Sequence, residues 1–575
     1  MKKANTLWQV TPHADREFYS ALSELHPLLA QVLWARGNKS VEQARAFIAD
    51  TSLSADPNAL TDIDKAVERI LQAIGAGESI TIYGDYDCDG VTACALLMSA
   101  LTQLGAKPQI YIPDRFEEGY GLNSTALDKL KAQGVNLVIT VDCGARAINE
   151  AQHARDIGLD LIVTDHHDLE HELPQALAVI NPKRPDCHYA FKQLAGVGVA
   201  YRLAQALFAQ AKLANETTHA FHDLVAIGTI ADVMPLIGEN RSLVRAGLQM
   251  INTTPRLGVT ELVRAARLKA GHVSAGQVAF QLAPRLNAAG RLDTALNAYE
   301  LLMTDNPAWA TDLANTLSSR NEQRQQITAA VVRAAEKQLA ANLEPEKLPL
   351  SFAASSDYNA GVIGLAAARL VERYIRPAVV VMITGEEARG SCRSVSDFHI
   401  TDALDACKPL LLKHGGHAAA AGFTTRTQWL GELQQRLYEL AQAQRPEQGW
   451  VKTIHADAEI NLHKLSSQTH AAMQLLEPHG HGNPQPIFVA RQIEVRSARR
   501  IGRVEEDAGH EVNAGPHLKL SLKDARGGNW NAIGWRMGER FDETPPGAKI
   551  DLAFHLDMNE WNGEKRLQLV LEDIH

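Results

Sequence analysis

The chain of 575 residues has few aromatic residues, few cysteines and no long apolar run. Its six cysteines include no CxxC pair, which argues against a thiolate zinc site. No stretch approaches ~18 consecutive apolar residues, so we expect no membrane-spanning helix and no membrane partner. The first residues carry two lysines but no apolar segment, which argues against a secretory signal. We therefore expect a cytoplasmic protein whose thiols are reduced.

The composition is that of a globular protein, with 22% charged and 45% hydrophobic residues, which excludes disordered and collagen-like classes. At roughly 100–200 residues per domain, the length predicts three or four domains.

The net charge of −10 argues at first against a nucleic-acid-binding protein. The charge is segregated, however. Residues 51–240 contain 25 acidic and 13 basic residues, and the rest of the chain contains 42 acidic and 44 basic residues. The excess of acid therefore lies in one block, where we expect the chemistry.

The order of predicted elements divides the chain into five parts. Residues 1–50 form a helical N-terminal segment, and 51–300 alternate strands and helices in the pattern of a parallel, doubly wound α/β sheet. Residues 301–345 form a long connecting helix, which Asn306 and Pro307 would begin. Residues 346–450 form a smaller α/β domain, in which the glycines of "HGGHAAAAGF" predict a loop. Residues 451–575 contain about five short strands that predict an OB-type β-barrel.

Acidic and imidazole side chains follow three predicted strands of the first α/β block. In a parallel sheet the carboxyl ends of the strands lie at one edge, so these groups should converge. A fourth candidate, Asp232, lies in an otherwise apolar stretch. The strand-end residues are Asp85, Asp87, Asp89, Asp142, Asp165, His166 and His167.

So many carboxylates repel one another unless cations neutralise them. Oxygen-rich ligands with one or two imidazoles suit Mn²⁺ or Mg²⁺, and a pair of ions sharing a carboxylate is typical of in-line displacement at phosphorus. The alternative for each single Asp is a helix cap or an Asx turn, and four acid-rich motifs in one block favour the metal site.

These motifs resemble a known family. "GDYDCDG", "VTVDCG", "TDHH" and "GTIADVMPL" have the order and spacing of the DHH phosphoesterase superfamily. "GVIGLAAARL", "GSCRSV" and "HGGHAAAAGF" resemble its DHHA1 companion domain, as does "PRLNAAGRLDTA" upstream. "EPHGHGNPQPIF", followed by strands, resembles the entry to the OB domain of RecJ-type exonucleases.

The resemblance implies a DHH domain, a DHHA1 domain and an OB domain, with two Mn²⁺ or Mg²⁺ ions in the first. The residues that match the metal ligands are Asp87, Asp89, Asp142, His166 and Asp232, with Asp142 bridging. His167 matches either a ligand or a donor to the transition state.

The resemblance also implies substrate contacts, which we expect at Arg115, Arg285, Asn287, Arg291, Ser391, Arg393 and His417. Arg499, Arg500 and Arg503, with Trp530 and Trp535 further on, fit a basic groove with stacking aromatics. For each arginine the alternative is a surface salt bridge or a solvated charged face.

By this resemblance the activity is a 5′→3′ exonuclease that degrades single-stranded DNA to 5′-mononucleotides in recombination and repair. Single-strand-binding protein and a RecQ-type helicase are the partners expected. Two alternatives stay open: a DHH phosphodiesterase acting on short oligonucleotides or cyclic dinucleotides, and a catalytically silent nucleic-acid-binding or replication scaffold.

Overall fold

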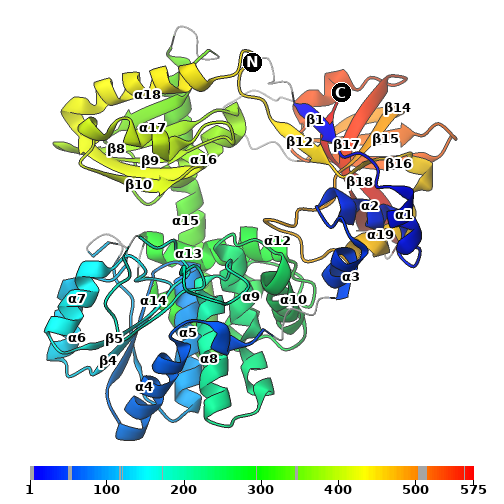
Figure 1. Cartoon of the computed structure of the whole chain (residues 1–575). Coiled ribbons are helices and arrows are strands. Elements are labelled where there is room, and N and C mark those ends of the chain that lie inside the picture. Colours follow the sequence, from blue (N-terminus) through cyan, green and yellow to red (C-terminus); the bar gives the residue numbers. More distant parts are fainter. Residues whose placement is uncertain are drawn as a thin grey trace. The chain divides into compact units, whose positions relative to one another are not determined.

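The computed structural model describes residues 6–49, 55–114, 118–119, 121–170, 172–292, 294–342, 347–502, 515–561 and 564–575. It divides into two compact units (Figure 1). Residues 52–450 and 480–482 belong to the first unit, and residues 5–51, 451–479 and 483–575 to the second. Two expected contact residues, Arg115 and Arg503, lie outside the described residues.

The first unit begins with a parallel sheet of five strands in the order β3-β2-β4-β5-β6. The strands are β2 (Ile80–Gly84), β3 (Gln109–Tyr111), β4 (Leu137–Val141), β5 (Asp160–Thr164) and β6 (Ala178–Ile180). The chain passes from β2 outward to β3 and returns to β4 on the other side of β2. This reversal is the switch point at which open α/β sheets form a crevice.

Helices cover both faces of this sheet, which confirms the doubly wound arrangement (Figure 1). One face packs against α4 (Ile63–Ala76), α5 (Cys88–Gln103) and α8 (Gly196–Gln210). The other packs against α6 (Ser124–Ala132) and α7 (Ile148–Asp156).

Further helices extend the first core. They are α9 (His222–Ala231), α10 (Gly238–Thr253), α11 (Leu257–Ala265), α12 (Ala275–Gln277), α13 (Ala283–Leu292) and α14 (Leu296–Met303), with a π-helical turn at Val278–Leu282.

The expected long helix is α15 (Pro307–Ala340), capped by the Asn306 side chain, which accepts hydrogen bonds from two backbone amides. Leu313 and Leu317 pack in the core of the first sheet, and Val331 and Leu339 pack in a core of the second α/β block. The helix therefore joins two hydrophobic cores. This agrees with the connecting helix expected from the sequence, since a long helix that is polar on most sides is typical of a bridge between domains.

The second α/β block contains a sheet in the order β10-β11-β9-β8-β7, in which only β7 and β8 are parallel. Its elements are β7 (Ser351–Ser355), α16 (Ile363–Tyr374), β8 (Ala378–Thr384), β9 (Glu387–Arg393), α17 (Ile400–Asp405), β10 (Lys413–His417), β11 (Ala420–Arg426) and α18 (Leu430–Gln444). The glycines of "HGGHAAAAGF" predicted a loop, and this prediction was wrong. The segment forms the hairpin of β10 and β11, because small residues allow close pairing with β9.

The second unit contains a barrel with strands in the order β13-β14-β15-β16-β18-β17, closed by pairing of β14 with β17. This confirms the OB-type barrel. Its elements are β12 (Thr453–Ala456), β13 (Ala458–Glu459), α19 (Ser467–Gln474), β14 (Phe488–Ile501), β15 (His517–Lys523), β16 (Asn529–Gly534), β17 (Lys549–Trp561) and β18 (Glu564–Ile574).

The N-terminal segment packs in this second unit. It contains β1 (Leu7–Val10), α1 (Arg16–Ala21), α2 (Pro27–Ala35) and α3 (Val41–Ala49). β1 pairs in parallel with β12, and apolar residues of α1 and α2 share one core with the barrel. In the described part of the chain, no helix combines the length and apolar character that crossing a membrane requires.

Candidate metal centre

The register of the first sheet brings three acidic residues side by side at its carboxyl edge. Gly84 of β2 pairs with Val141 of β4, and Val141 pairs with Thr164 of β5. Asp85, Asp142 and Asp165 are the next residues along the three strands. The convergence expected from the sequence therefore follows from a row of paired residues.

Ligand-type atoms at this edge form three groups, in each of which the atoms lie within 4.8 Å of one another. Two of the groups share no residue: one consists of Asp85, Asp87 and Asp142, and the other of Asp89, His166 and Asp232. The third group shares Asp142 with one and His166 with the other, and it consists of Asp142, Asp165, His166 and His167.

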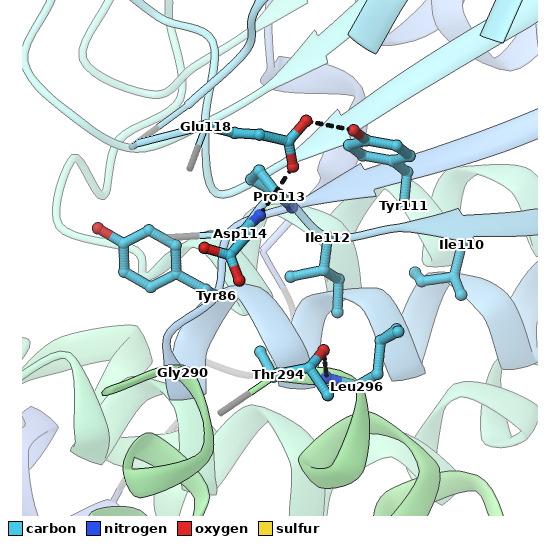
Figure 2. A pocket seen from close by; sticks show the side chains of 11 residues that line it. Tyr86, Ile110, Tyr111, Ile112, Pro113, Asp114, Glu118, Gly290, Thr294 and Leu296 are labelled. Atoms are coloured by element: carbon cyan, nitrogen blue, oxygen red, sulfur yellow. Dashed lines mark hydrogen bonds between the residues drawn. The ribbon is translucent and has the colours of Figure 1, made fainter. Parts of the chain in front are cut away.

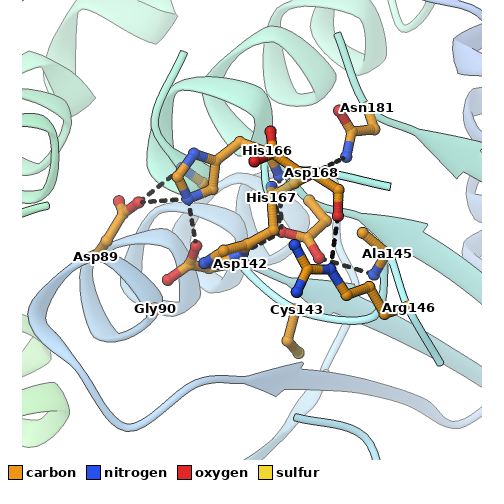
Figure 3. Close-up of polar contacts among 12 residues, drawn as sticks. Asp89, Gly90, Asp142, Cys143, Ala145, Arg146, His166, His167, Asp168 and Asn181 are labelled. Carbon is orange, nitrogen blue, oxygen red and sulfur yellow. Dashed lines mark hydrogen bonds and ion pairs between the residues drawn. The ribbon is translucent and has the colours of Figure 1, made fainter. Parts of the chain in front are cut away.

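The Nε2 atom of His166 joins the two groups. It lies 3.1 Å from Asp142 Oδ1 and 3.9 Å from Asp89 Oδ2 (Figure 3). Asp232 Oδ2 lies 3.4 Å from the same atom. All five expected metal ligands are therefore close together, with Asp142 adjacent to both groups.

Two helix N-termini hold the carboxylates of the first motif. Asp87 is the N-cap of α5, and its Oδ1 atom accepts hydrogen bonds from the amides of Asp89 and Gly90. The two oxygens of Asp89 accept from the amides of Gly196 and Val197, at 2.6 and 2.9 Å, in the first turn of α8. Backbone amides at a helix N-terminus favour a negative charge, so both carboxylates are fixed in place.

Left-handed backbone occurs at one expected ligand and directly beside another. Asp142 has a φ of 61°, and Val233, next to Asp232, has a φ of 58°. Such conformations are costly for non-glycine residues, most of all for a β-branched one, and they concentrate at functional sites.

Asp165 connects the two histidines to the turn after β4. Its Oδ1 atom accepts hydrogen bonds from the amides of His166 and His167 and from His167 Nδ1, at 2.7, 3.1 and 2.8 Å. Its Oδ2 atom accepts from the Ala145 amide at 2.7 Å. Asp165 lies near the metal-ligand atoms, but its oxygens are engaged, so it is a positioning residue.

The electrostatics of the site reflect burial and crowding. Burial, reinforced by the charges of neighbouring carboxylates, raises the pKa of Asp89 and Asp142 well above the usual range and that of Asp232 to about 7. Burial lowers the pKa of His166 to about 3, so its imidazole is neutral at pH 7. Burial opposes protonation of His167, but the hydrogen bond and charge of Asp165 raise its pKa to about 9.

These residues fit a pair of divalent cations. Within the described residues, Asp142 Oδ1 and His166 Nε2 are both buried without a hydrogen bond, although they approach each other. A neutral imidazole has a lone pair free for a cation. Carboxylates with raised pKa values hold protons readily, and a divalent cation can take the place of those protons because it binds the same oxygen atoms. The oxygen-rich ligand set suits Mn²⁺ or Mg²⁺.

The second α/β block gathers polar groups at the start of α16. Gly364 lies so close to β9 that an added Cβ atom would fall 2.9 Å from Ser391 Oγ and 3.2 Å from Arg393 Nη2. Arg393 Nη1 donates to Ser391 Oγ at 3.3 Å and to the Cys392 carbonyl at 2.8 Å. A guanidinium, a hydroxyl and the first turn of a helix make a suitable anion cradle.

The other expected contacts of this unit differ in what they bind. Arg285 donates to Ser318 Oγ and the Gln281 carbonyl, Arg291 donates to the Gly361 carbonyl, and Asn287 accepts from the Cys88 amide. His417 is exposed on β10, and its Nδ1 atom lies 3.9 Å from an oxygen of Asp168.

The barrel arginines also differ from one another. Arg499 is exposed on β14 and pairs across the sheet with Lys519 of β15. The guanidinium of Arg500 lies 5.3 Å from the Phe541 ring centroid and 3.7 Å from Asp542. Trp535 is 56% exposed, whereas Trp530 donates its indole N–H to Asp524 and packs against the barrel core. Trp535 is therefore the better candidate for stacking.

Sequence reasoning missed the amides of Gly196 and Val197, which hold Asp89 from 107 and 108 residues away. The signal was "GVGVA" before a predicted helix, since glycine at a helix start allows close approach. It also left Asp85 out of the ligand set, although Asp85 groups with Asp87 and Asp142.

Three segments of the chain match known domain families. Residues 79–229 match the DHH family, N-terminal domain; residues 347–443 match the DHHA1 domain; and residues 456–573 match the RecJ OB domain.

Several relatives match this chain over almost its whole length. The single-stranded-DNA-specific exonuclease RecJ of Bacillus subtilis is 36% identical over 98% of this chain and 70% of its own length. The Escherichia coli protein of the same name is 32% identical, with 96% of each chain covered. The crystal structure of RecJ from Thermus thermophilus in complex with Mn²⁺ superposes with a TM-score of 0.83 at 31% identity, covering 99% of this chain and 79% of that one. The chain belongs to the RecJ family of single-stranded-DNA-specific exonucleases.

Proposed function

We propose that this protein hydrolyses single-stranded DNA from its 5′ end to 5′-mononucleotides with two bound Mn²⁺ or Mg²⁺ ions. The observation that carries this proposal is the buried cluster around Asp142, whose carboxylate groups with Asp85 and Asp87 and also with His166. The family comparison supports the substrate class, since the full-length relatives are single-stranded-DNA-specific exonucleases.

In this proposal Asp87, Asp89, Asp142, His166 and Asp232 hold the ions. Bound ions would activate the attacking water and offset charge that develops on the phosphate. Because Asp165 binds Nδ1 of His167, that ring presents Nε2 on its other side, where it can donate to a phosphate oxygen.

The cradle of Ser391, Arg393 and the α16 N-terminus would hold the 5′ phosphate. Arginine presents a planar fork that matches a phosphate, and helix amides add further donors. His417 on β10 and Arg115 are proposed to assist. A grip on a terminal phosphate would place the first phosphodiester at the metals and so set the polarity.

The barrel would supply further contacts to the single strand. Arg499 and Lys519 lie opposite each other on neighbouring strands, and like charges in that position repel unless an anion lies between them. An exposed Trp535 adds a face on which a base can stack. Arg500 and Arg503 are proposed contacts of the same kind.

An oligonucleotide assay tests the proposal. A 5′-phosphorylated strand carrying a 3′ label should release mononucleotides from the 5′ end with Mn²⁺ or Mg²⁺, and should stay intact with EDTA. Asp142→Ala should abolish turnover while largely retaining strand binding. Digestion that starts at the 3′ end, or that ignores the metal, would contradict the proposal.

Finer assignments are part of the same proposal. We propose domain boundaries near residues 50, 300, 345 and 450, and a role in recombination and repair. Single-strand-binding protein and a RecQ-type helicase are the proposed protein partners, to be tested by pull-down with purified proteins. A cytoplasmic location is supported by six cysteines that are all buried and form no disulfide.

A further inference from the structure

We infer that Asn287 and Gly290 of α13 are positioning residues that fix the loop Asp85–Asp89 and thereby set the affinity of the metal centre. The inference rests on the metal-binding part of the proposed function. It also changes the role expected for Asn287, which the sequence placed among the substrate contacts.

Asn287 binds the loop at the point where it becomes a helix. Its Oδ1 atom accepts a hydrogen bond of 2.8 Å from the Cys88 amide. Cys88 lies between Asp87 and Asp89, and it is the first residue of α5. The first amides of a helix have no partner within the helix, so an outside acceptor is needed to fix this turn. Asn287 supplies that acceptor from a helix far along the chain.

Gly290 fixes the same loop one turn further along α13. A Cβ atom at this position would lie 2.5 Å from the Tyr86 carbonyl oxygen and 3.3 Å from Tyr86 Cβ. The first of these contacts is with backbone, so a side chain at position 290 would displace the loop. Tyr86 lies between Asp85 and Asp87, and its displacement would move both carboxylates.

The space beside this contact favours such a displacement. Tyr86 and Gly290 both line a cavity of about 290 Å³ that extends to Tyr111 and Leu296 (Figure 2). A loop pushed by a new side chain could therefore move into open volume rather than meet a rigid wall. On its other side the loop is held by close packing against α13, because tightly packed atoms resist displacement.

The same helix also contacts the second α/β block. Arg291 Nη1 donates to the Gly361 carbonyl at 3.1 Å, and a Cβ atom at Gly361 would lie 2.8 Å from the Arg291 carbonyl oxygen. Gly361 precedes α16, whose first turn forms part of the proposed phosphate cradle. Within one helix, residues 287–291 therefore touch both the metal-ligand loop and the segment that leads to the cradle.

A metal titration without DNA separates positioning from substrate contact. Mn²⁺ binding to the full-length protein is measured by calorimetry for wild type, Asn287→Leu, Asn287→Asp and Gly290→Ala. We expect Asn287→Leu and Gly290→Ala to weaken binding by about tenfold or more, as residues that orient ligands usually do. Asn287→Asp keeps an acceptor oxygen and should bind Mn²⁺ nearly as well as wild type.

Gly75→Ala is the matched control, because Gly75 is a helical glycine of α4 with nothing within 4 Å of an added Cβ atom. It should leave Mn²⁺ binding unchanged. Circular dichroism checks that each variant is folded, and if Gly290→Ala does not fold, the two Asn287 variants decide the question.

The outcomes distinguish this inference from the proposed function. Wild-type affinity for Mn²⁺ in Asn287→Leu, together with a raised KM for the oligonucleotide, would make Asn287 a substrate contact and overturn the inference alone. Equal weakening in Asn287→Leu and Asn287→Asp would also overturn it, since the acceptor would then be irrelevant. A wild-type protein that binds no Mn²⁺ would overturn the metal part of the proposed function and the inference with it.

Discussion

Replacing Asp165 by asparagine removes the one charge that connects the two histidines to the turn after β4. Asparagine has nearly the same shape, so packing is retained. One of its two acceptor oxygens becomes an NH₂ group, however. That group would face either the Ala145 amide or the donors of His166 and His167, all of which need an acceptor.

The expected loss of stability is about 2 kcal/mol. The hydrogen bond from His167, opposed by burial, lowers the pKa of Asp165 from 3.8 to about 2. At about 1.4 kcal/mol per unit this corresponds to roughly 2 kcal/mol. A single hydrogen bond to a charged group contributes about 1.5–3 kcal/mol, which agrees. The raised pKa of His167 describes the same interaction from the other partner, so the two are not added.

Urea unfolding in EDTA measures this loss. The folded pKa of Asp165 is lower than the unfolded one, so its contribution is present above pH ~4 and disappears as the pH falls towards 2. The raised pKa of His167 sets the upper limit, since the same interaction weakens as the pH rises from about 6.5 through 9. The difference between wild type and Asp165→Asn should therefore be constant from about pH 4 to 6.5, vanish in acid and decrease towards pH 9. Asp168→Asn is the control, because Asp168 is 56% exposed and its pair with Lys183 should contribute little.

Manganese binding provides the second measurement. Asparagine leaves one of these donors without an acceptor and removes the charge that orients His167, so Mn²⁺ affinity should fall by about tenfold. If Asp165→Asn unfolds like wild type and binds Mn²⁺ equally well, then Asp165 does not position the histidines and the reasoning is refuted.

Three further predictions concern other parts of the chain. Arg202 is fully buried against Glu239, so Arg202→Ala should lower the unfolding free energy by about 3–5 kcal/mol, and an unchanged urea midpoint would contradict this. Arg393→Ala should raise KM about tenfold for 5′-phosphorylated strands but little for 5′-hydroxyl strands, because a charged hydrogen bond to the terminal phosphate is lost. Arg499→Ala should reduce the salt dependence of strand binding by about one phosphate contact in log–log slope, and an unchanged slope would exclude Arg499 from the DNA path.

The elements that the sequence predicted well are those whose pattern is local. The helix that begins at Pro307 was predicted from Asn306 and Pro307, because a side-chain cap and a fixed φ act within one turn. The hairpin of β10 and β11 was not predicted, since five small residues in a row carry no hydrophobic alternation. Its strands are specified by pairing with β9, which the local sequence does not reveal.

The candidate ligands posed a different problem, because each Asp had to be assigned either to a helix cap or to a metal. Asp87 shows that the two are compatible. Its Oδ1 atom caps α5, and its carboxylate also belongs to the group with Asp85 and Asp142. A carboxylate has lone pairs for both, and a cap that fixes its rotamer prepares it for a cation. Asp165 follows β5 directly, and both of its oxygens accept hydrogen bonds from backbone amides or from His167, which makes it a support for the ligands.

The supports themselves lie beyond what local pattern can predict. Asp89 is held by Gly196 and Val197, and Cys88 by Asn287 at a separation of 199 residues. Such contacts depend on which helices pack beside the carboxyl edge of the sheet, and periodicity does not specify that choice. Crowded carboxylates repel until cations bind, so rigid partners from distant helices must hold them in place. The acidic block that the charge distribution revealed therefore requires these long-range contacts. Variants at Gly196, Val197 and Asn287 should weaken metal binding more than they weaken DNA binding.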